Sequence, residues 1–335
     1  MVTLKDLAKK LDVSTSTVSK ALNDSSEISQ LTTDRVKALA KFYKYQPNTV
    51  ARNLKNRNTK TIGVIIPSIL NRFFAKALQG IEDEATKKGY QIITCISNES
   101  LTKEKKSIDL LANGSVDGFL IAASEETQIN AEFDHFVNLK NNNIPLVLFD
   151  RIVENINCDK VIIDDFEAAY FATNKLIERG CKNIAFLSTI EELNVGKLRK
   201  LGFKKAHRAS SLSNGNTLVF KIDSANNVQR QVRSILQNHK QIDGILAADN
   251  MSGTIAISVA RNLNLEIPED LAVVGFSDKT ISQLSSPKLS FIDQNAAEIG
   301  KKAFNLLLSR LMIKNEQVNY LVEKVPVTFE NFESL

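Results

Sequence analysis

A short segment near the N-terminus carries side chains whose types and spacing suit contact with a polyanion. Thr15, Ser16, Ser19 and Lys20 fall on or near the exposed side of a predicted helix that contains no Asp or Glu. Short hydroxyls and lysine can reach the base edges and backbone oxygens of DNA, whereas carboxylates are repelled by phosphates. The pattern therefore favours a DNA-binding surface, with a generic three-helix bundle as the alternative.

Three amphipathic helices are predicted around this segment. Ser14 and Ser29 are placed to cap the second and third helices, and Asp12, which tolerates left-handed backbone, suits the turn between the first two. Two short helices with a supporting third are typical of a helix-turn-helix. The expected buried positions follow a helical period: Leu4, Leu7, Ala8 and Leu11, then Val18, Ala21 and Leu22, then Val36, Leu39, Ala40 and Tyr43.

Charge is distributed unevenly along the chain. Residues 1–60 contain 12 Lys and Arg against 5 Asp and Glu, a net charge of +7, whereas residues 61–335 contain 31 against 33 and carry −2. A basic head on a slightly acidic body suggests a polyanion partner for the head alone. From charge alone, a solvated basic face is an equally good interpretation.

Length and composition narrow the class of protein. A chain of 335 residues is expected to form two or three domains. No apolar run approaches the roughly 20 residues of a membrane helix, and the N-terminus has no signal-peptide core. Cys95, Cys158 and Cys181 lie far apart without a CxxC pair or a nearby histidine cluster. We therefore expect a cytoplasmic protein with no membrane association, no metal site and no cofactor.

A short polar segment follows the three helices. Pro47 must end the third helix, and Asn48 can cap a new one of at most two turns over residues 49–56. Isolated helices of that length are marginal in water. The segment should therefore be ordered only when something holds it, and Leu54 is an apolar residue without an evident local role.

The rest of the chain alternates apolar runs with helical stripes. Near-continuous apolar strands separated by helices indicate parallel sheets covered on both faces. The number of strands is too high for one sheet of usual size, so two Rossmann-like subdomains are predicted. The candidate strands are residues 61–66, 91–96, 118–122, 146–149, 160–163, 183–187, 217–220, 244–247, 271–275 and 289–292.

Signatures of catalysis are missing from the sequence. No GxGxxG follows a strand, and neither GxxxxGK[ST] nor GxSxG occurs. His135, His207 and His239 are interpreted as surface residues. Asp164 and Asp165 point different ways as neighbours, so a catalytic dyad is not expected, and Asp165 is favoured as the N-cap of the following helix. We predict a protein that is not an enzyme.

The residues of the head and of the first strand closely resemble the lactose-repressor (LacI/GalR) family. The matching segments are residues 2–8 (VTLKDLA), 13–23 (VSTSTVSKALN), 45–54 (YQPNTVARNL) and 61–67 (TIGVIIP), and the resemblance covers essentially the whole chain. It implies an all-α helix-turn-helix headpiece (1–46), a hinge helix and linker (47–60), and an α/β periplasmic-binding-protein-like core (61–335). The core would consist of an N-subdomain (about 61–164 and 294–322) and a C-subdomain (about 165–293 and 323–335).

The resemblance also implies which residues contact DNA. Thr15, Ser16 and Lys20 would face the major groove, with Ser19 and Asn23 beside them. Many members of the family have arginine at the position of Lys20, so a looser specificity is expected because lysine lacks the bidentate fork. Two glycines of the family are replaced by Asp12 and Lys44. In a homodimer, paired hinge helices would enter the minor groove, with Leu54 as a wedge and with further contacts from Arg52, Asn53 and Lys55.

A small-molecule effector is expected in a cleft between the two subdomains. The resemblance places eight residues there: Asn71, Phe73, Phe74, Asp150, Arg199, Asp249, Asn250 and Ser277. The order Asp249-Asn250 reverses the usual one, so which of the two faces the effector is open. Ser277 stands where an aspartate is frequent. The set suits a sugar or sugar derivative better than a purine. We thus expect a repressor that binds a pseudo-palindromic double-stranded DNA operator as a dimer under effector control.

Overall fold

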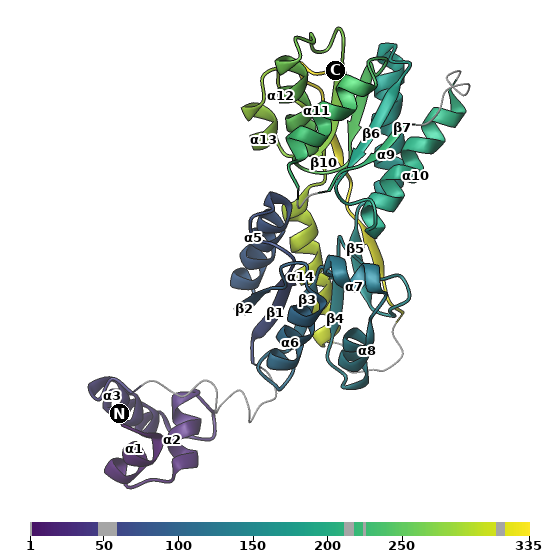
Figure 1. Cartoon of the computed structure of the whole chain (residues 1–335). Coiled ribbons are helices and arrows are strands. Elements are labelled where there is room, and N and C mark those ends of the chain that lie inside the picture. The colour runs from purple at the N-terminus through teal and green to yellow at the C-terminus, as the bar shows by residue number, and fades with distance from the viewer. Residues whose placement is uncertain (1, 46–58, 211–217, 224–225, 313–318) are drawn as a thin grey trace. The chain divides into compact units, whose positions relative to one another are not determined.

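The computed structural model describes residues 2–45, 59–210, 218–223, 226–312 and 319–335. The chain divides into two compact units, Met1–Thr59 and Lys60–Leu335, each of which is described by itself (Figure 1). The predicted hinge residues Arg52, Asn53, Leu54 and Lys55 lie outside the described residues.

The first unit is a bundle of three helices, α1 (Leu4–Leu11), α2 (Thr15–Leu22) and α3 (Gln30–Phe42). The predicted caps are confirmed: the Ser14 hydroxyl accepts from the Thr17 amide, and the Ser29 hydroxyl accepts from the Thr32 amide. The centre of the bundle is made by the predicted apolar stripes, whose fully or nearly fully buried members are Leu7, Ala8, Val18, Ala21, Val36 and Ala40.

The two positions where the family has glycine both adopt left-handed backbone. Asp12 has φ +54° at the end of α1, and Lys44 has φ +48° after α3. Asp tolerates this conformation more readily than lysine does, because its short polar side chain can bond locally. The turn after α1 therefore keeps its geometry without glycine.

The second unit contains two lobes, each built on one six-stranded sheet. The N-lobe sheet has the order β11-β5-β4-β3-β1-β2, and the pairs within it are parallel. Helices α5 and α14 pack on one face, and α6, α7 and α8 cover the other. The elements are β1 (Thr61–Ile66), α5 (Arg72–Lys87), β2 (Gln91–Ile96), α6 (Leu101–Leu111), β3 (Gly118–Ile121), α7 (Glu125–Asn130), α8 (Asp134–Asn141), β4 (Leu146–Phe149), β5 (Asp159–Ile162), α14 (Ala296–Met312) and β11 (Val322–Lys324).

The C-lobe repeats this plan in a sheet of the order β12-β10-β9-β8-β6-β7, in which only β12 is antiparallel to its neighbour. Helices α9 and α10 lie on one face, and α11 and α12 on the other. The elements are α9 (Asp165–Arg179), β6 (Ile184–Ser188), α10 (Asn194–Ala209), β7 (Leu218–Lys221), α11 (Val228–Asn238), β8 (Gly244–Ala247), α12 (Ser252–Asn262), β9 (Ala272–Ser277), α13 (Lys279–Leu284), β10 (Ser290–Asp293) and β12 (Thr328–Glu330). The predicted fold class, a helical headpiece with two Rossmann-like subdomains, is confirmed.

The chain passes between the lobes three times (Figure 1): after β5, after β10 and after β11. The third passage comes directly after the predicted boundary at about residue 323, because Val322–Lys324 pairs with β5 and so belongs to the N-lobe. The strand order in each lobe runs 2-1-3-4-5 in local terms, and in such sheets ligands bind beyond the carboxyl ends of the strands, beside the strand where the order reverses.

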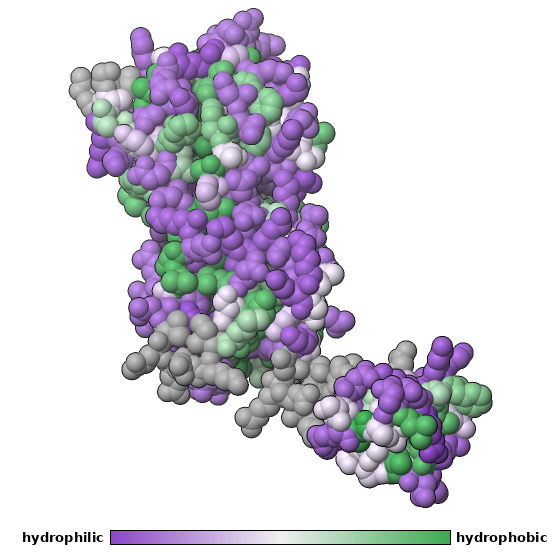
Figure 2. Space-filling model, turned by 180° about the vertical axis from the view of Figure 1, so that it is seen from behind, coloured by the Kyte–Doolittle hydropathy of each residue, from purple (hydrophilic) through white to green (hydrophobic). Residues whose placement is uncertain are grey.

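The surface seen in Figure 2 is mainly hydrophilic, and its apolar side chains form small patches. Many of the largest apolar side chains are buried between sheets and helices, as Phe119, Phe186 and Phe291 are. Among the residues that the structure describes, no helix is both long and apolar enough to cross a membrane.

Candidate functional sites: the reading helix and the interlobe cleft

Helix α2 (Thr15–Leu22), called the reading helix because it is predicted to contact the bases of DNA, has its polar residues on the side away from the core of the headpiece. Val18 and Ala21 are fully buried, whereas Thr15, Ser16 and Lys20 are exposed and Ser19 is half-buried. The period of the helix separates these two sets, since residues three or four apart share a face. The five headpiece residues predicted to contact DNA therefore lie on α2 or directly after it, where Asn23 is the C-cap.

Several of these polar groups already have partners in the headpiece. The Ser16 hydroxyl lies 2.8 Å from that of Ser14, and the Asn23 amide donates to the Ser19 carbonyl at 2.7 Å. Lys20 forms an ion pair with Glu27, a residue of the loop that follows α2. Within the described part of the chain, the hydroxyls of Thr15 and Ser19 make no hydrogen bond to protein. Helix α2 thus presents donors and acceptors to solvent.

The residues predicted to bind the effector come together between the two lobes. Seven of the eight line one cavity of about 50 Å³: Asn71, Phe73, Phe74, Asp150, Arg199, Asp249 and Asn250. The eighth, Ser277, lies next to it, where its hydroxyl is 3.5 Å from the Asn250 side-chain oxygen. Asp150, Asp249 and Asn250 lie in the loops that follow β4 and β8, and Ser277 ends β9. Asn71 caps α5, whose first turn contains Phe73 and Phe74, and Arg199 is on α10.

Arg199 is the most constrained side chain of the cleft, with 3% of its surface exposed. Its guanidinium donates to Asp165 at 2.7 Å, to the Ala248 carbonyl at 2.7 Å and to the Gln294 side chain at 2.6 Å. It also lies 3.8 Å from the centre of the Phe276 ring. Arg199 therefore forms hydrogen bonds with the start of α9, with the residue after β8, and with the crossover that follows β10.

Close packing of two helices brings Arg199 to Asp165. Gly202, one turn after Arg199 on α10, faces α9 so closely that a Cβ atom there would lie 2.1 Å from the Phe166 carbonyl oxygen. Any larger residue would push α10 away from α9 and lengthen the Arg199–Asp165 bond.

The predicted role of Asp165 as an N-cap is wrong. Asp164 caps α9 by accepting from the Glu167 amide at 3.1 Å, and its other oxygen accepts from Lys324 at 2.7 Å. Asp165 is the first helical residue and is buried against Arg199. Burial raises the pKa of Asp165, and the charge and hydrogen bond of Arg199 oppose that shift. Counting adjacent carboxylates along the sequence could not show which one the helix turns inward.

The structure distinguishes Asp249 from Asn250. The Asp249 carboxylate accepts from the amides of Thr189, Met251 and Ser252 and from the Ser252 hydroxyl. It is therefore committed to holding the loop after β8. Asn250 has one long contact with Ser277, so its amide is the group that this pair can offer to the cavity.

Asp150 is a second buried carboxylate whose pKa the cleft raises. Burial and the nearby Asp165 raise the pKa of Asp150 to about 7, although Arg199 and Arg151 act in the opposite direction. It has φ +56°, left-handed backbone that aspartate tolerates. At neutral pH this group can accept a hydrogen bond as a carboxylate or donate one as an acid.

Four further residues line the same cavity: Arg151, Ile190, Val195 and Gln294. Arg151 is 6% exposed, pairs with Glu99 at 2.5 Å and lies 5.2 Å from the Phe74 ring centre. Its position directly after Asp150, at the end of an apolar strand, was a usable signal in the sequence. Nothing in the local pattern marks Ile190, Val195 or Gln294.

The interpretation of the histidines as surface residues is wrong for two of the three. His135 and His207 are 5% and 4% exposed. The Nε2 atom of His135 lies 2.8 Å from Oε1 of the fully buried Glu104, away from the interlobe cavity. Polar neighbours in the sequence hid the fact that both histidines lie on the inner faces of their helices.

Comparisons with known proteins agree with this geometry. The model for bacterial regulatory proteins of the lacI family matches residues 3–48, and the model for the periplasmic binding protein-like domain matches residues 173–328. HTH-type transcriptional repressor PurR of Aliivibrio fischeri is 32% identical over 95% of this chain and 94% of its own length. The ribose operon repressor of Halalkalibacterium halodurans is 31% identical over 93% and 91%.

A solved lac repressor dimer, bound to operator and the anti-inducer ONPF, has the same fold, with a TM-score of 0.85 over 99% of this chain and 98% of that one, at 21% identity. The reading helix and the ligand-binding fold together define a DNA-binding transcription regulator and not an enzyme. The chain belongs to the LacI family of bacterial regulators, and its activity is transcriptional repression through a helix-turn-helix coupled to a ligand-binding domain.

Proposed function

We propose that this repressor binds a pseudo-palindromic operator as a homodimer and that a sugar or sugar derivative in the interlobe cleft controls binding. The observation that carries the proposal is the cavity in which seven predicted effector residues meet. The bases would be read by Thr15, Ser16, Ser19, Lys20 and Asn23, and the minor groove by the hinge residues 52–55. Since the DNA target lies in the cytoplasm, the protein would act there.

The chemistry of the cavity favours a polyhydroxylated effector. Phe73 and Phe74 meet edge to face at 5.2 Å, and they adjoin the charged and amide side chains of Asp150, Arg151 and Asn250. A sugar offers an apolar ring face to aromatic side chains, and each hydroxyl both donates and accepts. A relative named as a ribose operon repressor and a ribose-bound regulator from Enterococcus faecium, 26% identical with a TM-score of 0.70 over 82% of this chain and 98% of that one, support this choice. A purine is the second candidate, because a flat base can stack on the same rings.

The size of the cavity supports a coupling between effector binding and lobe movement. About 50 Å³ is far below the roughly 300–1,000 Å³ of typical ligand sites. An effector must therefore separate the lobes or displace internal partners such as Gln294. Because the chain crosses between the lobes three times, such a change alters their relative angle. We propose that this population shift decides whether paired hinge helices form.

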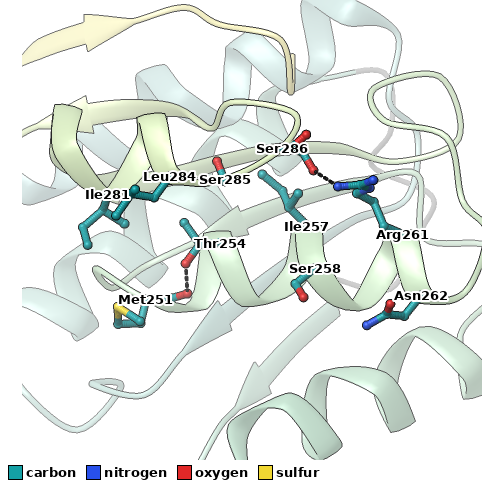
Figure 3. Close-up of a pocket in the computed structure, with 10 residues that line it drawn as sticks. All are labelled: Met251, Thr254, Ile257, Ser258, Arg261, Asn262, Ile281, Leu284, Ser285 and Ser286. Carbon is teal, nitrogen blue, oxygen red and sulfur yellow. Dashed lines mark hydrogen bonds between the residues drawn. The ribbon is translucent and has the colours of Figure 1, made fainter.

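The homodimer is supported by exposed apolar side chains on one face of the C-lobe. A depression of about 620 Å³ lies between α12 and α13 (Figure 3), and apolar side chains gather at one end of it. Leu284 is 79% exposed and Met251 is 51% exposed there. Exposed apolar groups beside a hollow are typical of protein interfaces. A second copy of the chain is the occupant that a two-fold operator requires. A Leu284→Asp variant should lower the mass measured by light scattering towards that of a monomer.

A ligand screen tests the effector. The full chain should show a rise in Tm with ribose, other pentoses or sugar phosphates and not with guanine or hypoxanthine. Asn250→Ala should abolish the rise, whereas Asn138→Ala, an exposed change outside the cleft on α8, should leave it intact. A rise with a purine alone would select the second candidate. A rise that Asn250→Ala does not change would remove the cleft as the site.

A further inference from the structure

A carboxylate reaches the reading helix from outside it. Helix α2 has no Asp or Glu of its own, yet Glu27 in the following loop forms an ion pair with Lys20. The two side chains are 66% and 46% exposed. The acid is therefore placed on the polar face that α2 presents, next to the lysine predicted to read bases.

Stability of the headpiece does not explain this pair. An exposed ion pair contributes little to folding, and the headpiece is held by its apolar centre of Leu7, Val18 and Val36. A lone carboxylate on a DNA-facing surface would weaken binding, because it would meet the field of the phosphates. Glu27 is compatible with that surface only while a donor accompanies it.

The chemistry of one base pair satisfies both groups at once. In the major groove guanine presents the acceptors O6 and N7, and its partner cytosine presents the N4 donor beside O6. The Lys20 ammonium has three donors. One can remain on Glu27 while the others reach guanine, and the second oxygen of Glu27 can accept from cytosine N4. Lysine alone is a point charge that distinguishes poorly between acceptors.

We propose that Glu27 is a specificity-determining residue that reads one G·C base pair in each half-site jointly with Lys20. The inference rests on the proposed placement of Lys20 in the major groove. Lys20 alone is expected to have a loose base specificity. With Glu27 beside it the specificity should be tighter, because the carboxylate adds a directional acceptor that lysine lacks.

Base preference measured with the full chain tests this. Duplexes are first selected by the wild-type protein from a randomised library. Binding to the selected duplex and to each of its single-base-pair variants is then measured by fluorescence anisotropy. Glu27→Gln should lower the preference for G·C at one position of each half-site by about 5- to 10-fold. Affinity for random-sequence duplex should rise slightly, because one negative charge is lost.

Asp24→Asn is the matched control. Asp24 lies in the same loop, is exposed and forms an ion pair with Lys37 of α3 instead of a residue of α2. Its replacement removes the same charge and should leave every base preference unchanged. An unchanged preference in Glu27→Gln, or an equal loss in Asp24→Asn, would overturn the inference. If Lys20→Gln also leaves all preferences unchanged, the placement of Lys20 itself fails, which separates the two conclusions. Far-UV circular dichroism checks that each variant folds.

Discussion

The reading helix and the interlobe cleft use similar polar side chains in opposite ways. On α2, Thr15, Ser16 and Lys20 are exposed and come from one helix of eight residues. In the cleft Arg199 and Asp165 are buried and bond to each other, and Arg199 also bonds to Gln294. On an exposed DNA-binding surface, water can accept hydrogen bonds from the donors until DNA binds. Buried donors must instead have protein partners in every state. The first region can therefore change without loss of the fold, and the second cannot.

The largest test of this contrast compares two basic residues. Arg199→Ala should destabilise the core by about 3–5 kcal/mol, because it leaves Asp165 buried without its counter-charge. Lys20→Ala should change the stability of the headpiece by less than about 0.5 kcal/mol. Urea unfolding followed by circular dichroism measures both. If the two variants lose similar amounts of unfolding free energy, Arg199 is no more important to the fold than Lys20, and the proposed difference between the cleft and the reading helix is wrong.

Asp150 offers a test that depends on pH. Its pKa is raised to about 7, so the folded protein holds the proton more tightly than the unfolded chain does. Between about pH 4 and pH 7 its contribution to stability therefore falls as pH rises. Asp150→Asn should stabilise the core at pH 8 by roughly 2–4 kcal/mol and at pH 5 by much less. Unfolding at the two pH values decides this, since an equal gain at both would mean that the cleft does not raise the pKa.

Leu54, which lies outside the described residues, allows a test of the DNA-binding part of the chain. If it is the minor-groove wedge, Leu54→Ala should weaken operator binding roughly 10- to 30-fold through the lost apolar contact. Effector binding should not change. Leu31→Ala, the same substitution at a 73% exposed position of α3, is the control. Unchanged operator affinity in the Leu54 variant would remove the wedge.

The contrast also explains how much the sequence could predict. The headpiece depends on local rules: the caps Ser14 and Ser29 and the apolar stripes follow from a period of 3.6 residues, and the structure has them as predicted. The ten predicted strands also follow from local patterns. The short strands β11 and β12 were missed, because their burial alternates over only three residues.

The cleft depends on contacts between residues that are far apart in sequence. Asp165 and Arg199 are 34 residues apart, and Arg199 and Gln294 are 95 apart. Periodicity says nothing about such pairs, so only the family resemblance located Arg199, and it gave no partner for it. For the same reason sequence patterns favour Asp165 as a cap and do not mark Gln294, Ile190 or Val195.

The smallest expected effect concerns the closure of the cleft. Asp278, on the C-lobe, accepts from Arg72 of α5 at 2.9 Å and lies 3.4 Å from Lys76, so it links the lobes beside Ser277 and Phe73. Burial alone would raise the pKa of Asp278, but Arg72, Lys76 and the Thr280 amide outweigh it and lower that pKa. The link is therefore present at neutral pH and lost only as pH falls through the lowered value.

Asp278→Asn should strengthen effector binding about 3- to 5-fold, because roughly 1 kcal/mol of a partly exposed pair holds the lobes together and opposes the separation that a cavity of about 50 Å³ requires. Calorimetry with the compound that gives the largest Tm rise measures it, and Asp109→Asn, an exposed change on α6, is the control. The reciprocal bonds between Gln128 and Asn194, at 2.8 and 3.0 Å, would still join the lobes elsewhere. If Asp278→Asn binds as well as wild type, those amides alone hold the cleft closed. The lobes would then be joined by neutral groups, and charge would act only inside the cavity.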